Sequence, residues 1–194
     1  MKREFLAIMA AVIFCLPVQC LLAQTVPSAQ AAASAKTASS PTAAPSAQAA
    51  QAQTATVKVT GEVLTPLTLT GADLAAMPRT NATAKDRQGV PHVFSGVAIA
   101  DILNKAGVTT GKQLKGENLA KYLLVTCADG YQVVFSLAEL DSSFTDRVVI
   151  LADQEEGKPL PASTGPFRMV VPGEKKPARN SFQVVALTVR FAKE

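Results

Sequence analysis

The chain changes character at Thr56, and this change limits which part of it can fold. Residues 24–55 contain Ala, Ser, Thr, Pro and Gln, with Val26 and Lys36 as the only exceptions. A segment with almost no large apolar side chains cannot offset its loss of conformational entropy, so we expect a flexible spacer there. From Thr56 to Glu194, short apolar runs alternate with turns rich in Gly and Pro, so we expect this part to fold.

The first 23 residues have the organisation of a secretory signal peptide. Lys2 and Arg3 precede an apolar run from Phe5 to Leu16, and Ala23 is the expected cleavage point. This run is shorter than the roughly 20 apolar residues that a membrane span needs. We therefore expect a periplasmic or secreted protein with no stable membrane span after cleavage. The expected organisation is a signal peptide (1–23), a spacer (24–55) and a folded domain (56–194).

Composition excludes several classes of function. Hydrophobic residues make up 48% of the chain and the net charge is +4, so a core can form but nucleic-acid binding through phosphate contacts is not expected. One histidine and three cysteines are too few for a zinc finger or a histidine-rich hydrolase site. Cleavage after Ala23 would leave Cys127 as the last cysteine, so the domain would have no internal disulfide.

The pattern after Thr56 predicts an α+β fold of mixed short-strand sheets with a few short helices. One helix is expected after Thr70 and before Pro78, a second over 99–106 before Gly107, and a helical turn over 137–140. The expected strands share alternating or continuous apolar character and lie at 57–63, 67–69, 81–85, 92–94, 122–126, 132–135, 148–152, 167–171 and 184–191.

No catalytic constellation is evident from the residues alone. His92 is the single histidine, and Ser95 lies three positions further along the same expected strand, so the two side chains point to opposite faces. Cys127 ends an apolar run and is expected to pack in the core, where a thiol is inert unless a basic group lowers its pKa.

A basic stretch near the C-terminus is more informative. Arg168 lies inside an apolar strand, and Lys175, Lys176 and Arg179 follow in a loop that contains Gly and Pro. Such a loop can enclose an anion with backbone N–H groups and cationic side chains. The alternative from the residues alone is a basic surface hairpin without a ligand.

Five segments in this order resemble the molybdopterin-binding domain of the sulfite-oxidase family of oxidoreductases. They are Phe94–Leu103, Ala128–Tyr131, Val149–Ala152, Gly157–Pro161 and Gly165–Gly173. The resemblance implies a mixed α+β fold with the pterin and its phosphate in a basic pocket, and molybdenum held by the pterin dithiolene and one protein cysteine. It assigns cofactor binding to a set of matched residues: Asp129, Gly130, Tyr131, Arg168, Lys175, Lys176 and Arg179.

The sequence departs from the family at the metal ligand. The family's cysteine precedes the Gly-Val segment, in the region matched here by 80–87, where this chain has no cysteine. Cys127 would be the metal ligand only if its strand placed the sulfur at the pocket floor. Two functions therefore stay open. One is an exported molybdopterin-dependent oxidoreductase that transfers an oxygen atom to or from a small substrate. The other is a non-catalytic periplasmic ligand-binding or accessory module, with a small anionic ligand or a redox or scaffold partner.

Overall fold

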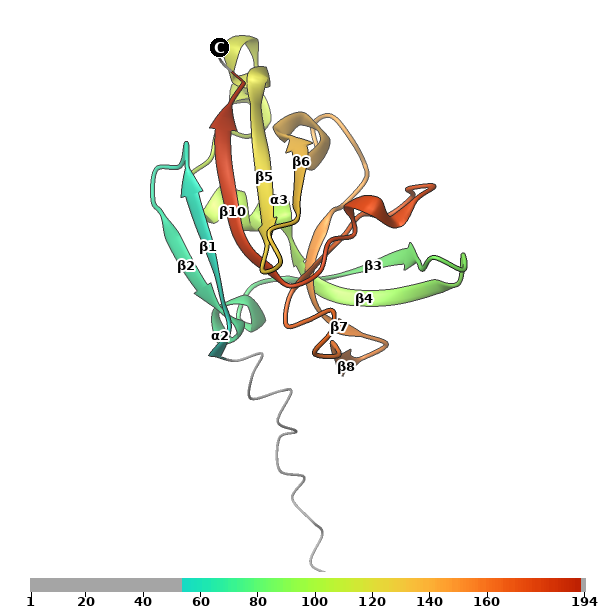
Figure 1. Cartoon of the computed structure of the whole chain (residues 1–194). Coiled ribbons are helices and arrows are strands. Elements are labelled where there is room, and N and C mark those ends of the chain that lie inside the picture. The colour runs from blue at the N-terminus through green and yellow to red at the C-terminus, as the bar shows by residue number, and fades with distance from the viewer. Residues whose placement is uncertain (1–53, 193–194) are drawn as a thin grey trace, which may run out of the picture. The chain divides into compact units, whose positions relative to one another are not determined.

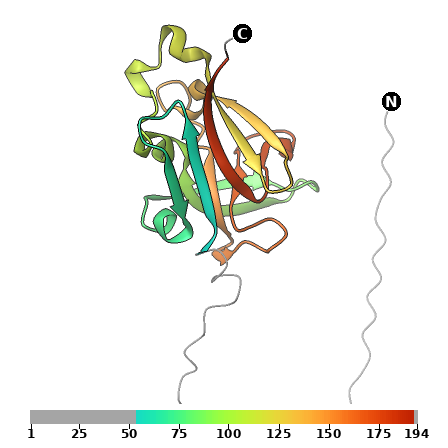
Figure 2. The ribbon, with the colours of Figure 1, turned by 60° about the vertical axis from the view of Figure 1, so that its left-hand side comes forward.

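The first of two sheets joins the two ends of the folded region. The computed structural model describes residues 54–192. The strand order of this sheet is β2-β1-β10-β5-β6 (Figures 1 and 2). Its strands are β1 (Thr56–Gly61), β2 (Leu67–Thr70), β5 (Lys121–Cys127), β6 (Gln132–Ser136) and β10 (Val184–Phe191). Strand β1 pairs with β10 in parallel, whereas the other neighbours in this sheet are antiparallel.

The second sheet is built around a long antiparallel hairpin. Its order is β3-β4-β7-β8, and β9 also pairs with β7. Its strands are β3 (Arg79–Lys85), β4 (Pro91–Ala98), β7 (Ile150–Glu155), β8 (Lys158–Pro159) and β9 (Arg168–Val170). In Figure 1 the β3–β4 hairpin and the loop between β9 and β10 extend from the same side of the domain.

Short helices connect the strands. They are α2 (Gly71–Ala75), α3 (Ile99–Lys105), η1 (Gly111–Gln113), η2 (Gly116–Ala120), η3 (Leu137–Leu140) and η4 (Pro177–Arg179). Thr70 caps α2, because its side chain accepts from the Asp73 amide while the Asp73 carboxylate accepts from the Thr70 amide. Gly107 follows α3 with φ of 73°, a left-handed conformation that glycine adopts without strain.

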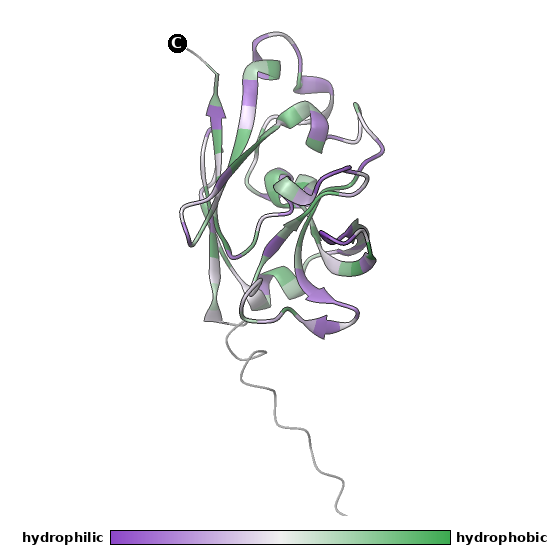
Figure 3. Cartoon of the chain, turned by 45° about the vertical axis from the view of Figure 1, so that its right-hand side comes forward, coloured by the Kyte–Doolittle hydropathy of each residue, from purple (hydrophilic) through white to green (hydrophobic). Residues whose placement is uncertain are grey.

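Two apolar clusters stabilise the domain. The larger one contains the buried side chains of α3 and the inward residues of β1, β5 and β10. The smaller one lies within the second sheet and consists of Ala82, Ala84, Phe94, Ile150, Ala152, Leu160 and Val170. Figure 3 shows that loops extending from the sheets carry much of the hydrophilic colouring. The smaller cluster matters for function, because it lies on the same sheet as Arg168.

Gly96 allows two strands of the second sheet to approach closely. A Cβ atom at this position would lie 2.1 Å from the backbone oxygen of Leu151. The register between β4 and β7 also shifts between Ser95 and Gly96. The glycine of the Gly-Val segment is therefore required by close contact between backbones.

The predicted α+β class is confirmed, with several strand boundaries corrected: the strand expected over 57–63 ends at Gly61, and the one expected over 92–94 spans Pro91–Ala98. The strand expected over 148–152 begins at Ile150, and Val148 lies before it with 45% of its surface exposed. The predicted signal peptide (1–23) and nearly all of the predicted spacer (24–55) lie outside the described residues. Between residues 54 and 192, no helix is long and apolar enough to cross a membrane.

Candidate functional site

Arg168 lies at the start of β9, on the face of the second sheet that carries the smaller apolar cluster. Side chains alternate along a strand, so Arg168 shares a face with Val170, while Met169 points to the larger cluster. Strand β9 pairs with β7, and Arg168 lies opposite Ala152. This pairing places a cation at the rim of an apolar surface.

Two phenyl rings hold the Arg168 guanidinium. Its central carbon lies 4.4 Å from the ring centroid of Phe94 and 4.7 Å from that of Phe182. Phe94 is buried, and Phe182 is 40% exposed. Both contacts are within the range of favourable cation–π interaction. The rings position the guanidinium but satisfy none of its N–H groups by hydrogen bonding.

The charge of Arg168 has no direct partner among residues 54–192. Its Nε atom is buried without a hydrogen-bond partner, and the side chain forms no ion pair with the described residues. Burial lowers the pKa of Arg168, and the carboxylate charge of Glu155 opposes this effect. Glu155 itself is paired with His92, whose Nδ1 atom lies 3.1 Å from Glu155 Oε1. The site therefore contains a partly desolvated cation that an anion would stabilise.

Arg179 has the opposite arrangement. Its guanidinium donates to Glu174 and Glu139, with Nε 2.7 Å from Glu174 Oε1 and Nη1 3.1 Å from Glu139 Oε2. Arg147 Nη2 also donates to Glu139 Oε2, at 3.0 Å. Burial alone would lower the pKa of Arg179, but the two carboxylates outweigh it and raise that pKa. Arg179 is thus engaged in a network of two arginines and two glutamates.

The other predicted residues lie near the same loop. Lys175 and Lys176 are exposed and form no ion pair with the described residues. Asp129, Gly130 and Tyr131 form the turn between β5 and β6, where Gly130 has φ of 84°. Tyr131 joins this turn to the loop, since its hydroxyl donates to the Ala178 carbonyl oxygen at 2.9 Å.

Cys127 lies at the end of β5 in the first sheet, and its side chain interacts with Ser181, the residue before Phe182. The residue is 3% exposed and belongs to the larger apolar cluster. Burial raises the pKa of the Cys127 thiol, the Ser181 side chain opposes this rise, and the Asp129 charge adds to it. Burial therefore favours the neutral thiol, whereas the thiolate is the form that binds a metal.

The region where the family has its cysteine is now defined. Residues 80–87 form most of β3 and the following turn, and Ala82 and Ala84 point into the smaller apolar cluster. Phe94 pairs opposite Ala82 across the β3–β4 hairpin. The surface beside Arg168 therefore presents methyl groups at the strand where the family resemblance implies a cysteine.

The sequence did not predict the two phenylalanines that contact Arg168 or the two glutamates that pair with Arg179. Phe94 was part of a resembling segment, but nothing in the pattern linked it or Phe182 to Arg168. Glu174 is five positions from Arg179, so its pairing could have been considered. Glu139 is 40 positions away, and only the fold brings it to Arg179.

These features describe an α+β domain of two sheets with a cation held at an apolar face, and comparison with known proteins identifies its family. Residues 43–176 match the family described as "Oxidoreductase molybdopterin binding domain". The chain therefore belongs to the oxidoreductase molybdopterin-binding domain family, whose name implies a molybdopterin cofactor.

A solved structure supports the fold assignment. The sulfane dehydrogenase SoxCD from Paracoccus pantotrophus is similar over 73% of this chain, with a TM-score of 0.57 and 24% identity. The match spans 40% of that protein's chain. A comparison with curated proteins found no match.

The residues fit one part of the cofactor and not another. An unpartnered guanidinium at Arg168 suits the phosphate of the pterin, because arginine binds phosphate through two parallel N–H groups. Beside it, β3 presents the methyl groups of Ala82 and Ala84, and Cys127 is a buried thiol whose pKa is raised by burial. Among residues 54–192, no group of three His, Cys, Asp or Glu side chains could hold a metal ion. The site suits an anion, and β3 contributes no cysteine beside it.

Proposed function

We propose that this chain is an exported, non-catalytic binding module that uses the molybdopterin-domain fold to hold an anion at Arg168. One observation carries the proposal: β3 directs Ala82 and Ala84 toward the apolar cluster beside Arg168, where the family supplies its cysteine. Soft thiolate donors bind metals that alanine cannot. The cation is retained while the metal ligand is missing.

The geometry at Arg168 limits the kind of anion. Phe94 and Phe182 lie within 4.7 Å of the guanidinium carbon, so the remaining donors are in the plane of the group. Planar donors match carboxylates and phosphates, which accept two parallel hydrogen bonds. The pterin phosphate is one such ligand, and a small free oxyanion is another. Lys175 and Lys176 lie in the following loop and would add positive charge around it.

Export and tethering complete the proposal. Residues 1–23 have a basic start and a short apolar run, which supports cleavage and a periplasmic location. Residues 24–55 are poor in large apolar side chains and would link the domain to a partner at variable distance. A periplasmic redox or scaffold protein is the class of partner that such a tether would serve.

The second candidate is a molybdopterin-dependent oxidoreductase that performs oxygen-atom transfer. The family match over residues 43–176 favours it. In this case molybdenum would have to be held without a cysteine from β3, and Cys127 is the one described alternative.

Metal and pterin content distinguish the two candidates. The full chain is expressed in a host that makes molybdopterin, purified from its periplasm, and analysed for molybdenum and pterin. We expect molybdenum far below one atom per chain in a well-folded protein. Stoichiometric molybdenum would overturn the proposal. If a Cys127→Ser variant then lost that metal, Cys127 would be its ligand.

A further inference from the structure

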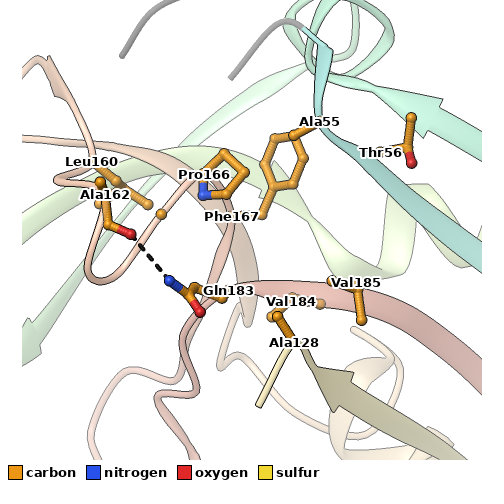
Figure 4. A pocket seen from close by; sticks show the side chains of 11 residues that line it. Ala55, Thr56, Ala128, Leu160, Ala162, Pro166, Phe167, Gln183, Val184 and Val185 are labelled. Carbon is orange, nitrogen blue, oxygen red and sulfur yellow. Dashed lines mark hydrogen bonds between the residues drawn. The ribbon is translucent and has the colours of Figure 1, made fainter. Parts of the chain in front are cut away.

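A pocket of about 420 Å³ is lined by residues on both sides of β9 and at the start of β10, among them Phe167, Gln183 and Val184. Its volume is within the roughly 300–1,000 Å³ common for small-molecule sites. Figure 4 shows Gln183 at one wall and Phe167 at another. All lining residues are uncharged: Ala55, Thr56, Ala128, Leu160, Ala162, Gly165, Pro166, Phe167, Gln183, Val184 and Val185.

This pocket is separate from the proposed anion site. None of the seven residues that the sequence assigned to cofactor binding lines it. Phe182 contacts Arg168, whereas the next residue, Gln183, contributes to the pocket wall.

Gln183 is held in a conformation that its side chain disfavours. Its φ is 51°, in the left-handed region that few residues other than glycine adopt. Three hydrogen bonds keep it there: its amide N–H donates to Thr164 O at 3.2 Å, its carbonyl oxygen accepts from Ala128 N at 2.9 Å, and Nε2 donates to Ala162 O at 3.0 Å. Backbone strain of this kind is concentrated at functional sites.

The hydrogen bond to Ala162 also fixes the direction of the Gln183 side-chain amide. Only the NH₂ group can donate to a carbonyl oxygen, so Oε1 is the other end of the amide. Figure 4 shows this oxygen directed away from Ala162. No residue between 54 and 192 donates a hydrogen bond to Oε1. Gln183 Oε1 is thus an acceptor with no donor among residues 54–192, on a residue that lines an uncharged pocket.

We propose that this pocket binds a small, uncharged and largely apolar molecule that donates one hydrogen bond to Gln183 Oε1. The uncharged lining disfavours ions, because a charge would lose its hydration without gaining a partner. The apolar walls provide most of the binding surface, and the single acceptor orients the ligand.

Indole and 1-methylindole test this proposal as a matched pair. Both are apolar and uncharged, but only indole has an N–H donor. Titration of the ¹⁵N-labelled full chain, followed by NMR, should give a dissociation constant for indole on the order of 1 mM, as expected for so small a ligand. The resonances of Ala162, Gln183 and Val184 should shift. We expect 1-methylindole to bind at least threefold more weakly, and indole-3-acetate to cause no shift at these residues.

Two variants separate the parts of the pocket. Gln183→Gly removes the amide and relieves the left-handed strain, so it should fold and abolish the difference between indole and 1-methylindole. Ala128→Phe enlarges an exposed lining residue and should abolish binding of both. Val134→Phe makes a larger side chain at an exposed position outside the pocket, and binding should be unchanged.

Three results would overturn the proposal. The first is no shift of the pocket resonances up to the solubility limit of indole. The second is equal affinity for indole and 1-methylindole in the wild-type chain. The third is a coupled shift of residues preceding Ala55, which would mean that the chain itself is the occupant displaced by indole.

Discussion

Arg168 and Arg179 are both stacked on phenyl rings, yet they are held in opposite ways. Arg179 lies 4.7 Å from the Phe135 ring centroid and donates to Glu139 and Glu174. Arg168 lies between two rings and contacts no carboxylate among the described residues. Stacking on a ring therefore does not distinguish a structural arginine from a ligand-binding one in this domain. The presence of a carboxylate partner distinguishes them.

Arg168 and Arg179 lie at the two ends of one loop and have different roles. At Arg179 the positive charge is neutralised within the protein, so the side chain fixes the loop over Phe135. At Arg168 the charge is positioned by rings and left for a ligand. Removing each ring or each guanidinium should therefore affect different measured quantities.

The largest expected effect is on stability and comes from the ring beneath Arg179. Phe135 is fully buried, so Phe135→Ala should lower the free energy of unfolding by about 3–5 kcal/mol. Phe182 is 40% exposed, and Phe182→Ala should lower it by less than about 1 kcal/mol. Urea denaturation of both variants measures these values. Equal losses would mean that the two stacks share one structural role.

The next effect concerns the anion site. Arg168→Gln should weaken binding of inorganic phosphate at least tenfold, because hydrogen bonds to charged groups contribute about 1.5–3 kcal/mol. Isothermal titration calorimetry of the full chain measures it. The unfolding free energy of Arg168→Gln should change by less than about 1 kcal/mol, because the variant removes both an unpaired, buried Nε and two cation–π contacts, which act in opposite directions.

Arg179→Gln is the matched control for that measurement. Its phosphate affinity should equal that of the wild-type chain, because Glu139 and Glu174 already neutralise Arg179. A tenfold loss in both variants would place Arg179 in the binding site and contradict the comparison.

Local chemistry explains how much of the fold could be predicted. The helix after Thr70 was predictable because its capping residues, Thr70 and Asp73, lie within four positions of each other. The end of α3 was predictable because a single glycine, Gly107, adopts the conformation that ends it. The parallel pairing of β1 with β10 was not predictable from pattern. It joins Lys58 to Ala186, and periodicity shows which face of a strand is apolar but not which strand lies beside it.

In the candidate site, too, features set by local sequence were predictable and features set by the tertiary fold were not. A charged residue within the apolar run of β9 marked Arg168 in the sequence. Phe182 gave no such signal, since its contact with Arg168 depends on how the chain returns after the loop. The missing cysteine was visible in the sequence, but the inward direction of Ala82 and Ala84 required the strand register.

A smaller effect on stability is expected from the charge network itself. Arg179→Gln should lower the free energy of unfolding by about 1 kcal/mol, typical of a partly exposed ion-pair network. The loss should shrink in 1 M NaCl, where the Debye length is about 3 Å. A Glu139→Gln variant and the double variant complete a mutant cycle. Additive losses would show that Arg179 and Glu139 do not stabilise each other.

The smallest effect tests whether the first sheet provides a thiolate. Burial raises the pKa of Cys127 above that of an unfolded thiol, which is about 8.5. Above that pH the unfolded chain loses the thiol proton while the folded chain keeps it, so stability must fall as pH rises. Relative to Cys127→Ala, the wild-type chain should therefore lose free energy of unfolding from about pH 8.5 upward, as urea denaturation across pH can measure. A wild-type gain over the same range would mean that the fold favours the thiolate. Cys127 would then be chemically suited to a soft metal, and this result would favour the catalytic candidate over the non-catalytic binding module.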